Sequence, residues 1–151
     1  MQLAYLFHVL GVVVWVGGMF FAYMALRPVA ASVLEPPQRL TLWAGVFGKF
    51  FPWVWLSVAS ILLTGLHMVV KLGAATPLYA LVMLALGTLM MLLFGHVYYV
   101  PYARLKRAVG AQDWPAGGAA LGQIRTLIGV NLSLGLLTIV VVFVGRVLAG
   151  A

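Results

Sequence analysis

The sequence contains four long apolar runs, and their length restricts what the chain can fold into. They cover residues 2–26, 51–72, 77–100 and 127–148. A helix needs roughly 18 apolar residues to cross a bilayer, and each run at ~1.5 Å per residue reaches about 30 Å, the thickness of the hydrocarbon core. Membrane β-barrel strands would instead give short segments of alternating polarity. The sequence therefore predicts an all-α integral membrane protein, a bundle of four transmembrane helices in one domain over residues 1–151.

The few charged residues predict how the bundle is oriented. They make up only 7% of the chain, whereas a soluble domain normally carries about 25%. Seven of the nine basic residues lie in two connections, between the first and second runs and between the third and fourth: Arg27, Arg39, Lys49, Arg104, Lys106, Arg107 and Arg125. The positive-inside rule places both connections in the cytoplasm and both termini outside. We expect a multi-pass protein of a bacterial-type inner (plasma) membrane, with the lipid bilayer as its partner and no nucleic acid.

Local signals predict where the helices begin and end. Pro28 predicts the end of the first helix, because proline disrupts a continuing helix. Asp113 is a predicted N-cap with Pro115 in the first turn that follows. Gly73 and Pro77 bracket a predicted short turn. Three aromatic residues at the start of the second run resemble an interfacial belt: Phe51, Trp53 and Trp55.

The chain has three histidines, one in each of the first three predicted helices. Ionisable side chains inside a membrane are costly, and they tend to face the bundle interior at functional sites. With the predicted topology, His8 and His67 both lie about 8–9 Å inside the outer boundary, at ~1.5 Å per residue. His96 lies near the cytoplasmic end of the third helix. His8 and His67 can therefore meet, whereas His96 belongs to another layer.

Two stripes with helical spacing support this pairing. Small residues and a tryptophan follow His8 along one face, where a neighbouring helix or a flat cofactor could approach closely: Gly11, Trp15, Gly18 and Ala22. A polar stripe runs through the second helix: Ser57, Ser60, Thr64, His67 and Lys71. A polar stripe facing lipid would be unfavourable, so we expect both stripes to face inward.

Three interpretations of the paired histidines follow from their chemistry. Neutral imidazole is the commonest protein ligand for transition metals, so His8 and His67 could be the axial ligands of haem b. They could also form part of a copper site that thioethers complete, because thioethers suit Cu(I), and Met83 lies at a similar depth. In the third interpretation, the histidines hydrogen-bond to Ser, Thr or the backbone and only hold helices together.

A second polar group is predicted at the inner level of the bundle. His96 comes just before a basic segment, and the fourth helix brings Arg125 and Asn131 to the same depth. Such a cluster could hold a haem propionate or another anion, because arginine binds carboxylates with two hydrogen bonds. The alternative is an arginine that extends to the membrane interface, beside interfacial tyrosines.

The first helix resembles that of a known membrane family. Residues 8–20, HVLGVVVWVGGMF, contain a His, a Trp seven residues later and then a Gly-Gly pair. This pattern resembles the opening helix of the copper resistance protein D (CopD) family. Residues 34–39 and 95–98 are also similar to short, single-unit members, and the resemblance extends over nearly the whole chain. It implies a membrane protein concerned with copper.

The chain is also similar to the HemJ-type protoporphyrinogen oxidases, four-helix membrane proteins that bind haem b. The resemblance rests on His8, on the segment 94–96 that ends in His96, and on Arg125 and Asn131. It implies that these residues bind haem, and it makes His96 an alternative to His67 as the partner of His8. One motif differs, because HemJ proteins commonly have His-x-Lys-Leu where this chain has Leu-Tyr-Ala-Leu at 78–81. The difference argues against protoporphyrinogen oxidation.

Three functions are consistent with these patterns. The first is a haem b protein for membrane electron transfer or oxidation, a haem-dependent oxidoreductase with a redox partner or quinone. The second is a copper transport or resistance protein with a His/Met site, and the third is a non-catalytic accessory subunit. Each of the three could act as a homo-oligomer. No catalytic residue is assigned. The only two carboxylate side chains, Glu35 and Asp113, lie outside the apolar runs, which argues against acid–base hydrolysis and against a proton-driven transporter of the usual kind.

Overall fold

The structure, a computed structural model, describes residues 2–150 and is helical throughout this range apart from short turns. Its elements are α1 (Gln2–Phe21), the π-helical turn η1 (Ala22–Leu26), α2 (Arg27–Val33), α3 (Pro36–Leu72), the 3-10 turn η2 (Gly73–Ala75), α4 (Leu78–Tyr99), α5 (Pro101–Gly110) and α6 (Trp114–Leu148). Four continuous helical segments are long and apolar enough to cross a membrane: Gln2–Val33, Pro36–Ala75, Leu78–Gly110 and Trp114–Leu148. The predicted all-α fold with four transmembrane helices is confirmed.

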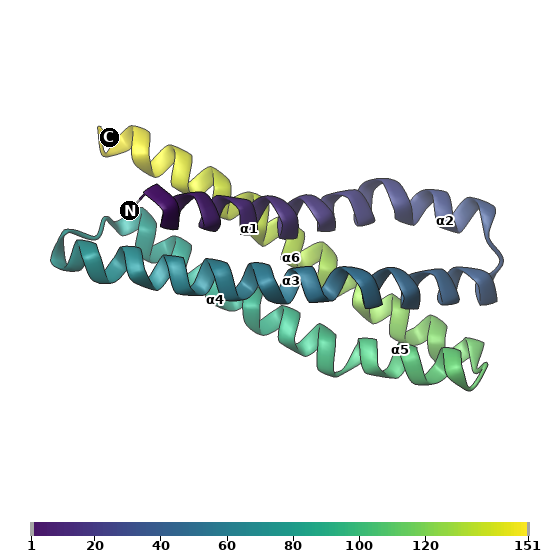
Figure 1. Cartoon of the computed structure of the whole chain (residues 1–151). Helices are drawn as coiled ribbons and strands as arrows, with labels where there is room; N and C mark the ends of the chain where they lie inside the picture. Colours follow the sequence, from purple (N-terminus) through teal and green to yellow (C-terminus); the bar gives the residue numbers. More distant parts are fainter. Residues whose placement is uncertain (1, 151) are drawn as a thin grey trace.

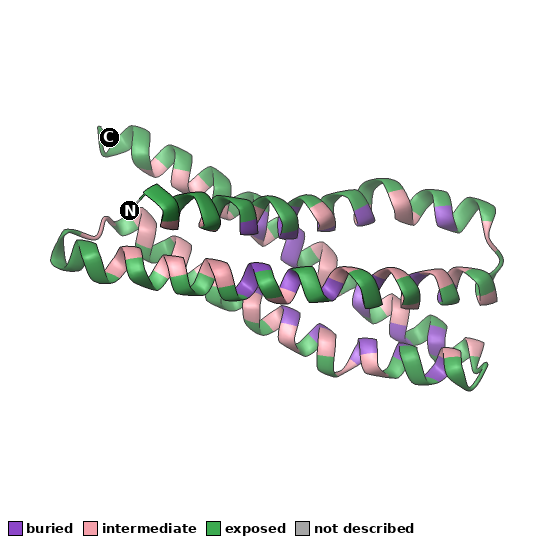
Figure 2. Cartoon of the chain, viewed as in Figure 1, coloured by how far each residue is buried: buried purple, intermediate pink, exposed green. Residues whose placement is uncertain are grey.

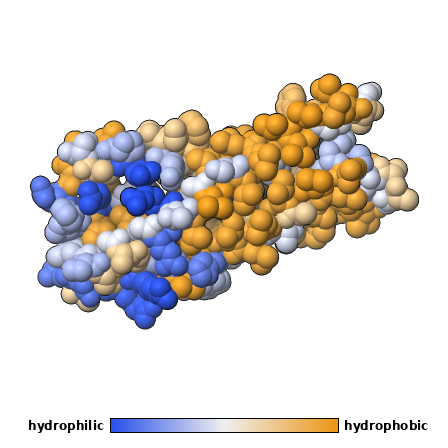
Figure 3. All heavy atoms as spheres, turned by 180° about the vertical axis from the view of Figure 1, so that it is seen from behind, coloured by the Kyte–Doolittle hydropathy of each residue, from blue (hydrophilic) through white to orange (hydrophobic). Residues whose placement is uncertain are grey.

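The bundle has two chemically different ends. Both termini and the α3–α4 turn lie at one end, which we call the terminal end, while the α2–α3 and α5–α6 connections lie at the other (Figure 1). We call the second the basic end. Hydrophilic surface gathers at one end of the molecule, and the rest is largely hydrophobic (Figure 3). Large apolar side chains are exposed along all four spans, as expected where lipid is the solvent. The side of the membrane that each end faces remains a prediction.

The first helix does not end at Pro28, so that prediction was wrong. The chain continues as a helix to Val33, and Pro28 lies in the first turn of α2. Just before it, the backbone N–H of Arg27 bonds to the carbonyl of Ala22, a π-type turn one residue wider than an α-turn. A proline ring clashes with the carbonyl four residues earlier in a regular helix. The wider turn relieves that clash, and the helix passes through the proline.

Two other end signals are confirmed. The Asp113 side chain accepts a hydrogen bond from the backbone N–H of Ala116 at 3.1 Å, which makes it the N-cap of α6. Gly73 ends α3 with a φ of 53°, a backbone conformation that glycine adopts without strain. The turn from Gly73 to Pro77 is therefore as short as the sequence indicates, and it sets α3 and α4 side by side.

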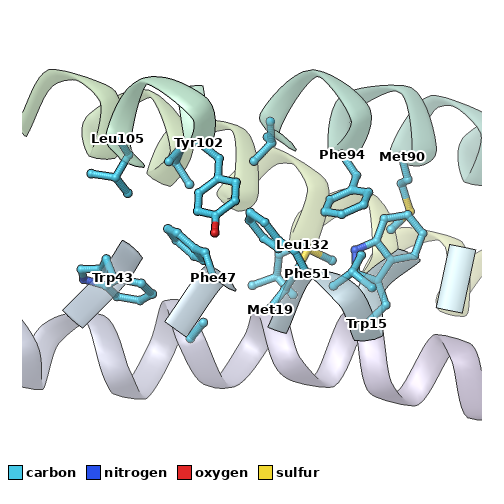
Figure 4. Packing of buried hydrophobic residues seen from close by; sticks show 14 of the residues in the cluster. Trp15, Met19, Trp43, Phe47, Phe51, Met90, Phe94, Tyr102, Leu105 and Leu132 are labelled. Atoms are coloured by element: carbon cyan, nitrogen blue, oxygen red, sulfur yellow. The ribbon is translucent and has the colours of Figure 1, made fainter. Parts of the chain in front are cut away.

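The packed core lies toward the basic end. Buried residues of α3 fall between Leu40 and Val58, and those of α4 begin at Met90. Near the termini the helices show few buried residues (Figure 2). Aromatic rings dominate the core, and the Phe51 ring centroid lies 4.9 Å from that of Tyr102 and 5.3 Å from that of Phe94 (Figure 4). Phe51 is 3% exposed. Its predicted place in an interfacial belt was wrong, because α3 turns this residue into the bundle.

Candidate functional site

His8 lies against the polar stripe of α3, close to the terminal end. Its Nδ1 is 3.0 Å from the hydroxyl oxygen of Thr64, and the side chain is partly buried. The imidazole packs beside Gly65, where a Cβ would lie in van der Waals contact with the ring, 3.4 Å from Cε1. One turn away, the Ser60 hydroxyl donates to the backbone carbonyl of Phe7 at 3.1 Å. These contacts hold α1 against α3 here, and the bond to Thr64 sets the orientation of the His8 ring.

The hydrogen bonds of Thr64 determine which imidazole nitrogen carries the proton. The Thr64 hydroxyl donates to the carbonyl of Ser60 at 2.6 Å. Its single hydrogen is then committed, so Thr64 can only accept from His8. Nδ1 of His8 is therefore the N–H donor, and Nε2 keeps its lone pair. A histidine that binds a metal through one nitrogen usually donates the other N–H to such a partner.

The glycine-containing stripe of α1 faces inward, as predicted, with Gly11, Trp15 and Ala22 buried. The surface of this α1 stripe is covered by side chains of α3. A Cβ at Gly11 would lie 2.9 Å from Cγ1 of Ile61, and a Cβ at Gly18 would overlap the Phe50 ring. The small residues thus allow α1 and α3 to approach each other closely. A flat macrocycle does not fit this seam, because Ile61 and Phe50 already fill it.

The other two predicted metal ligands, His67 and Met83, lie in the half of the bundle near the terminal end. Thr64 meets His8, but His67, one turn further along α3, is exposed. Met83 lies in α4 and is partly buried. His67 and Met83 flank the short α3–α4 turn at similar distances along the chain. Within residues 2–150 no cluster of three His, Cys, Asp or Glu side chains is present.

The structure places the three members of the predicted inner cluster in different surroundings. His96 is exposed on α4, and Arg125 is exposed on α6. Asn131 is 4% exposed, and its Nδ2 donates to the backbone carbonyl of Met90 at 3.3 Å. Its Oδ1 has no hydrogen-bond partner among residues 2–150. Asn131 also lines an apolar cavity of about 150 Å³ in the core, beside Trp15 and Phe51.

Sequence reasoning missed two features that bear on function. Thr64 appeared only as a member of a polar stripe, although it is the direct partner of His8. Arg27 and Arg39 were counted for topology alone, yet both line a larger pocket of about 570 Å³ at the basic end, together with Arg125. A basic residue in each of three helix-end segments was the available signal.

Comparison with known proteins identifies the family. The family model described as CopD, copper resistance protein D, matches residues 44–144, about two thirds of the chain. The chain belongs to the CopD family. The match includes the polar stripe of α3, His67, Met83 and His96, whereas His8 precedes it. A search of curated proteins and a search of solved structures each found no match.

Membership gives the protein a general setting. It is a multi-pass membrane protein of a family related to copper resistance, and its spanning helices imply a lipid bilayer around it. The HemJ-type resemblance found no support of this kind. Of the segments that carry the resemblance in the sequence, the matched range includes residues 95–98. Residues 34–39 lie before it.

Proposed function

We propose that this CopD-family protein handles copper within the membrane, binding it as Cu(I) near the terminal end with His8 as the principal ligand. His67 and Met83 are the further candidate ligands, on the two helices that the short turn joins. Imidazole and thioether groups suit Cu(I), which is the softer oxidation state of copper. Copper is the cargo in this proposal.

One observation carries the proposal. Nδ1 of His8 donates to a Thr64 oxygen whose own hydrogen is directed to Ser60, so Nε2 is left as an oriented lone pair. The nitrogen on the other side of the ring from the Thr64 bond is therefore the one that a metal ion could bind. The ring also packs against the backbone of α3 at Gly65.

The ligand set favours copper over haem b and electron transfer. The seam beside His8 that could accept a flat macrocycle is filled by Ile61 and Phe50. A single copper ion needs much less space, and the candidate ligands are neutral. Because both carboxylate side chains lie outside the apolar runs, bound Cu(I) would keep its single positive charge, and a shallow position near the membrane surface limits the cost of that charge.

The proposal is tested by titrating the full-length protein with Cu(I). The protein in lipid nanodiscs competes under reducing, oxygen-free conditions with a chromogenic Cu(I) chelator, and an absorption spectrum is recorded first. We expect one Cu(I) per chain for the unmodified protein, and a loss of affinity of more than about 100-fold for His8→Ala, since a ligand matters at least as much as the groups that orient it. His67→Ala should lose about tenfold.

His96→Ala is the matched control, because it removes an exposed histidine from the other half of the bundle. It should bind Cu(I) like the unmodified protein. Equal affinity in His8→Ala and His96→Ala would refute the copper site. A Soret band in the untreated protein that disappears with His8→Ala would assign the same nitrogen to haem b instead.

A further inference from the structure

A pocket of about 570 Å³ opens at the basic end, between η1, α2, α3 and α6. Its walls include one arginine from each of three helices, Arg27 of α2, Arg39 of α3 and Arg125 of α6. Arg27 and Arg39 are partly buried. The Arg27 guanidinium lies over the Tyr23 ring, with Cζ 4.8 Å from the ring centroid. This cation–π contact holds one of the three charges at the pocket wall.

The side chains of the protein cannot neutralise these three charges. The sequence has nine basic residues and only two acidic ones, Glu35 and Asp113. Asp113 is already the N-cap of α6, where it accepts the N–H of Ala116. Two carboxylate side chains cannot neutralise three guanidinium groups, so at least one positive charge has no counter-charge from a side chain of the protein. An anion from outside the chain is the natural partner, because arginine binds phosphate and carboxylate groups through paired hydrogen bonds.

The rest of the pocket is apolar and leads toward the core. Trp43 and Trp114 form part of its wall, and tryptophan is typical of the membrane interface. The pocket shares Ala22, Phe47 and Ile128 with the inner cavity that Asn131 lines. The two spaces therefore adjoin.

We propose that this pocket binds an anionic amphiphile, with its phosphate or carboxylate head between Arg27, Arg39 and Arg125 and its apolar chain directed along the aromatic walls into the bundle. The favoured source is an anionic phospholipid of the leaflet that surrounds the basic end. Polybasic groups at a membrane surface attract such lipids. This site lies at the opposite end of the bundle from His8, and it does not depend on copper binding.

Native mass spectrometry of the whole protein tests the proposal. The protein is released from nanodiscs that contain equal amounts of phosphatidylglycerol and phosphatidylcholine with identical acyl chains, and the retained lipid is identified. We expect a phosphatidylglycerol molecule to be retained in preference to phosphatidylcholine. The variant Arg27→Gln/Arg39→Gln/Arg125→Gln should reduce that preference by about tenfold or more, because it removes the charged hydrogen-bond donors that would hold the phosphate.

The matched control is Arg104→Gln/Lys106→Gln/Arg107→Gln, which removes three charges from α5 at the same end without touching the pocket wall. It should keep the preference for phosphatidylglycerol. Equal loss in both triple variants would show general attraction to a basic surface and would overturn the site. Equal retention of both lipids by the unmodified protein would overturn it as well.

A second pair of variants tests the pocket while all charges stay in place. Gly122 lines the pocket, and a Cβ there would meet no atom within 4 Å, so Gly122→Leu adds side-chain volume at an open position of the wall. Gly87→Leu is the control on α4, where a Cβ also meets nothing and no wall of this pocket lies. Only Gly122→Leu should reduce phosphatidylglycerol retention.

Inorganic phosphate distinguishes the source of the anion. Phosphate added before release should leave the retained phosphatidylglycerol unchanged, because the apolar walls hold the lipid chain as well as its head. Displacement of the lipid by phosphate alone would assign the arginines to a soluble anion and would overturn the amphiphile proposal.

Discussion

The imidazole of His8 and the hydroxyl of Thr64 are joined by a 3.0 Å hydrogen bond between residues that are 56 positions apart in sequence. It connects the first transmembrane segment to the second. Because the Thr64 hydroxyl also donates to Ser60 at 2.6 Å, the bond has a fixed direction from Nδ1–H to the oxygen. The position of the free Nε2 follows from that direction.

Replacing Thr64 tests whether this bond orients a metal ligand. Thr64→Val keeps the side-chain shape but removes the acceptor for Nδ1–H. We expect Cu(I) affinity to fall by about 10- to 100-fold, as is typical for the loss of a group that orients a ligand. Thr64→Ser keeps the oxygen and should retain the affinity within about threefold. The measurement is competition with a Cu(I) chelator, and equal affinities in the two variants would show that Thr64 has no positioning role.

A substitution of Gly145 tests the packing of α4 against α6. A Cβ at Gly145 would overlap Cβ of Tyr79, an atom that cannot move without its helix. We expect Gly145→Ala to lower the free energy of unfolding by about 1–3 kcal/mol, the usual cost of overpacking. Gly87→Ala, where nothing lies within 4 Å, should be neutral or stabilising by up to about 1 kcal/mol. Thermal unfolding in one detergent compares the two, and a Gly145→Ala variant as stable as Gly87→Ala would contradict this close contact.

Substitutions of Asn131 test how a buried amide affects stability when its Oδ1 has no hydrogen-bond partner among residues 2–150. Asn131→Leu removes one hydrogen bond worth about 1 kcal/mol and also an unpaired acceptor that costs about 1–3 kcal/mol, so stability should stay equal or rise slightly. Asn131→Asp has nearly the same size but places a carboxyl group among apolar side chains, and it should lose about 3–5 kcal/mol. A marked loss of stability in Asn131→Leu would show that the Oδ1 atom has a partner in the membrane.

The charge distribution predicts that the basic end is cytoplasmic and that both termini are outside. A reporter enzyme that is active only in the cytoplasm should be inactive when fused to the C-terminus and active when inserted after Gly110, at the end of α5. Replacing the α5 basic residues with glutamine should weaken this preference. An active C-terminal fusion would contradict the predicted orientation and would show that the His8 region lies on the cytoplasmic side.

The sequence predicted the number of spans, the shared end of the two basic connections, the Asp113 cap and the Gly73 turn. These features depend on short-range properties, namely the length of apolar runs, the position of charges and the conformational preferences of single residues. The structure confirms each of them. The resemblance to the CopD family is confirmed by the family match over residues 44–144, and the spaced motif of the first helix at residues 8–20 lies outside that range.

The rotation of each helix about its axis came only from the tertiary structure. His67 was predicted to face His8, but Thr64, three residues earlier on α3, holds that place, and His67 is exposed. Side chains three residues apart on a helix differ by about 60° in direction and about 4.5 Å in height, and this difference separates a side chain that contacts α1 from one that does not. In a membrane chain, residues that face lipid and residues that face the core are equally apolar, so the pattern indicates helix rotation only weakly.

The tertiary structure alone also decided which distant residues meet. Arg27, Arg39 and Arg125 come from three helices, and nothing in their spacing places them around one pocket. The helix likewise continues past Pro28 because the η1 turn is wider than an α-turn, a local adjustment that the proline itself does not reveal. Apolar length and charge are properties of the sequence by itself, and they determined that this protein spans a membrane. The sites depend on how the helices pack, and that is decided by the fit of side chains from different helices, such as Ile61 against Gly11.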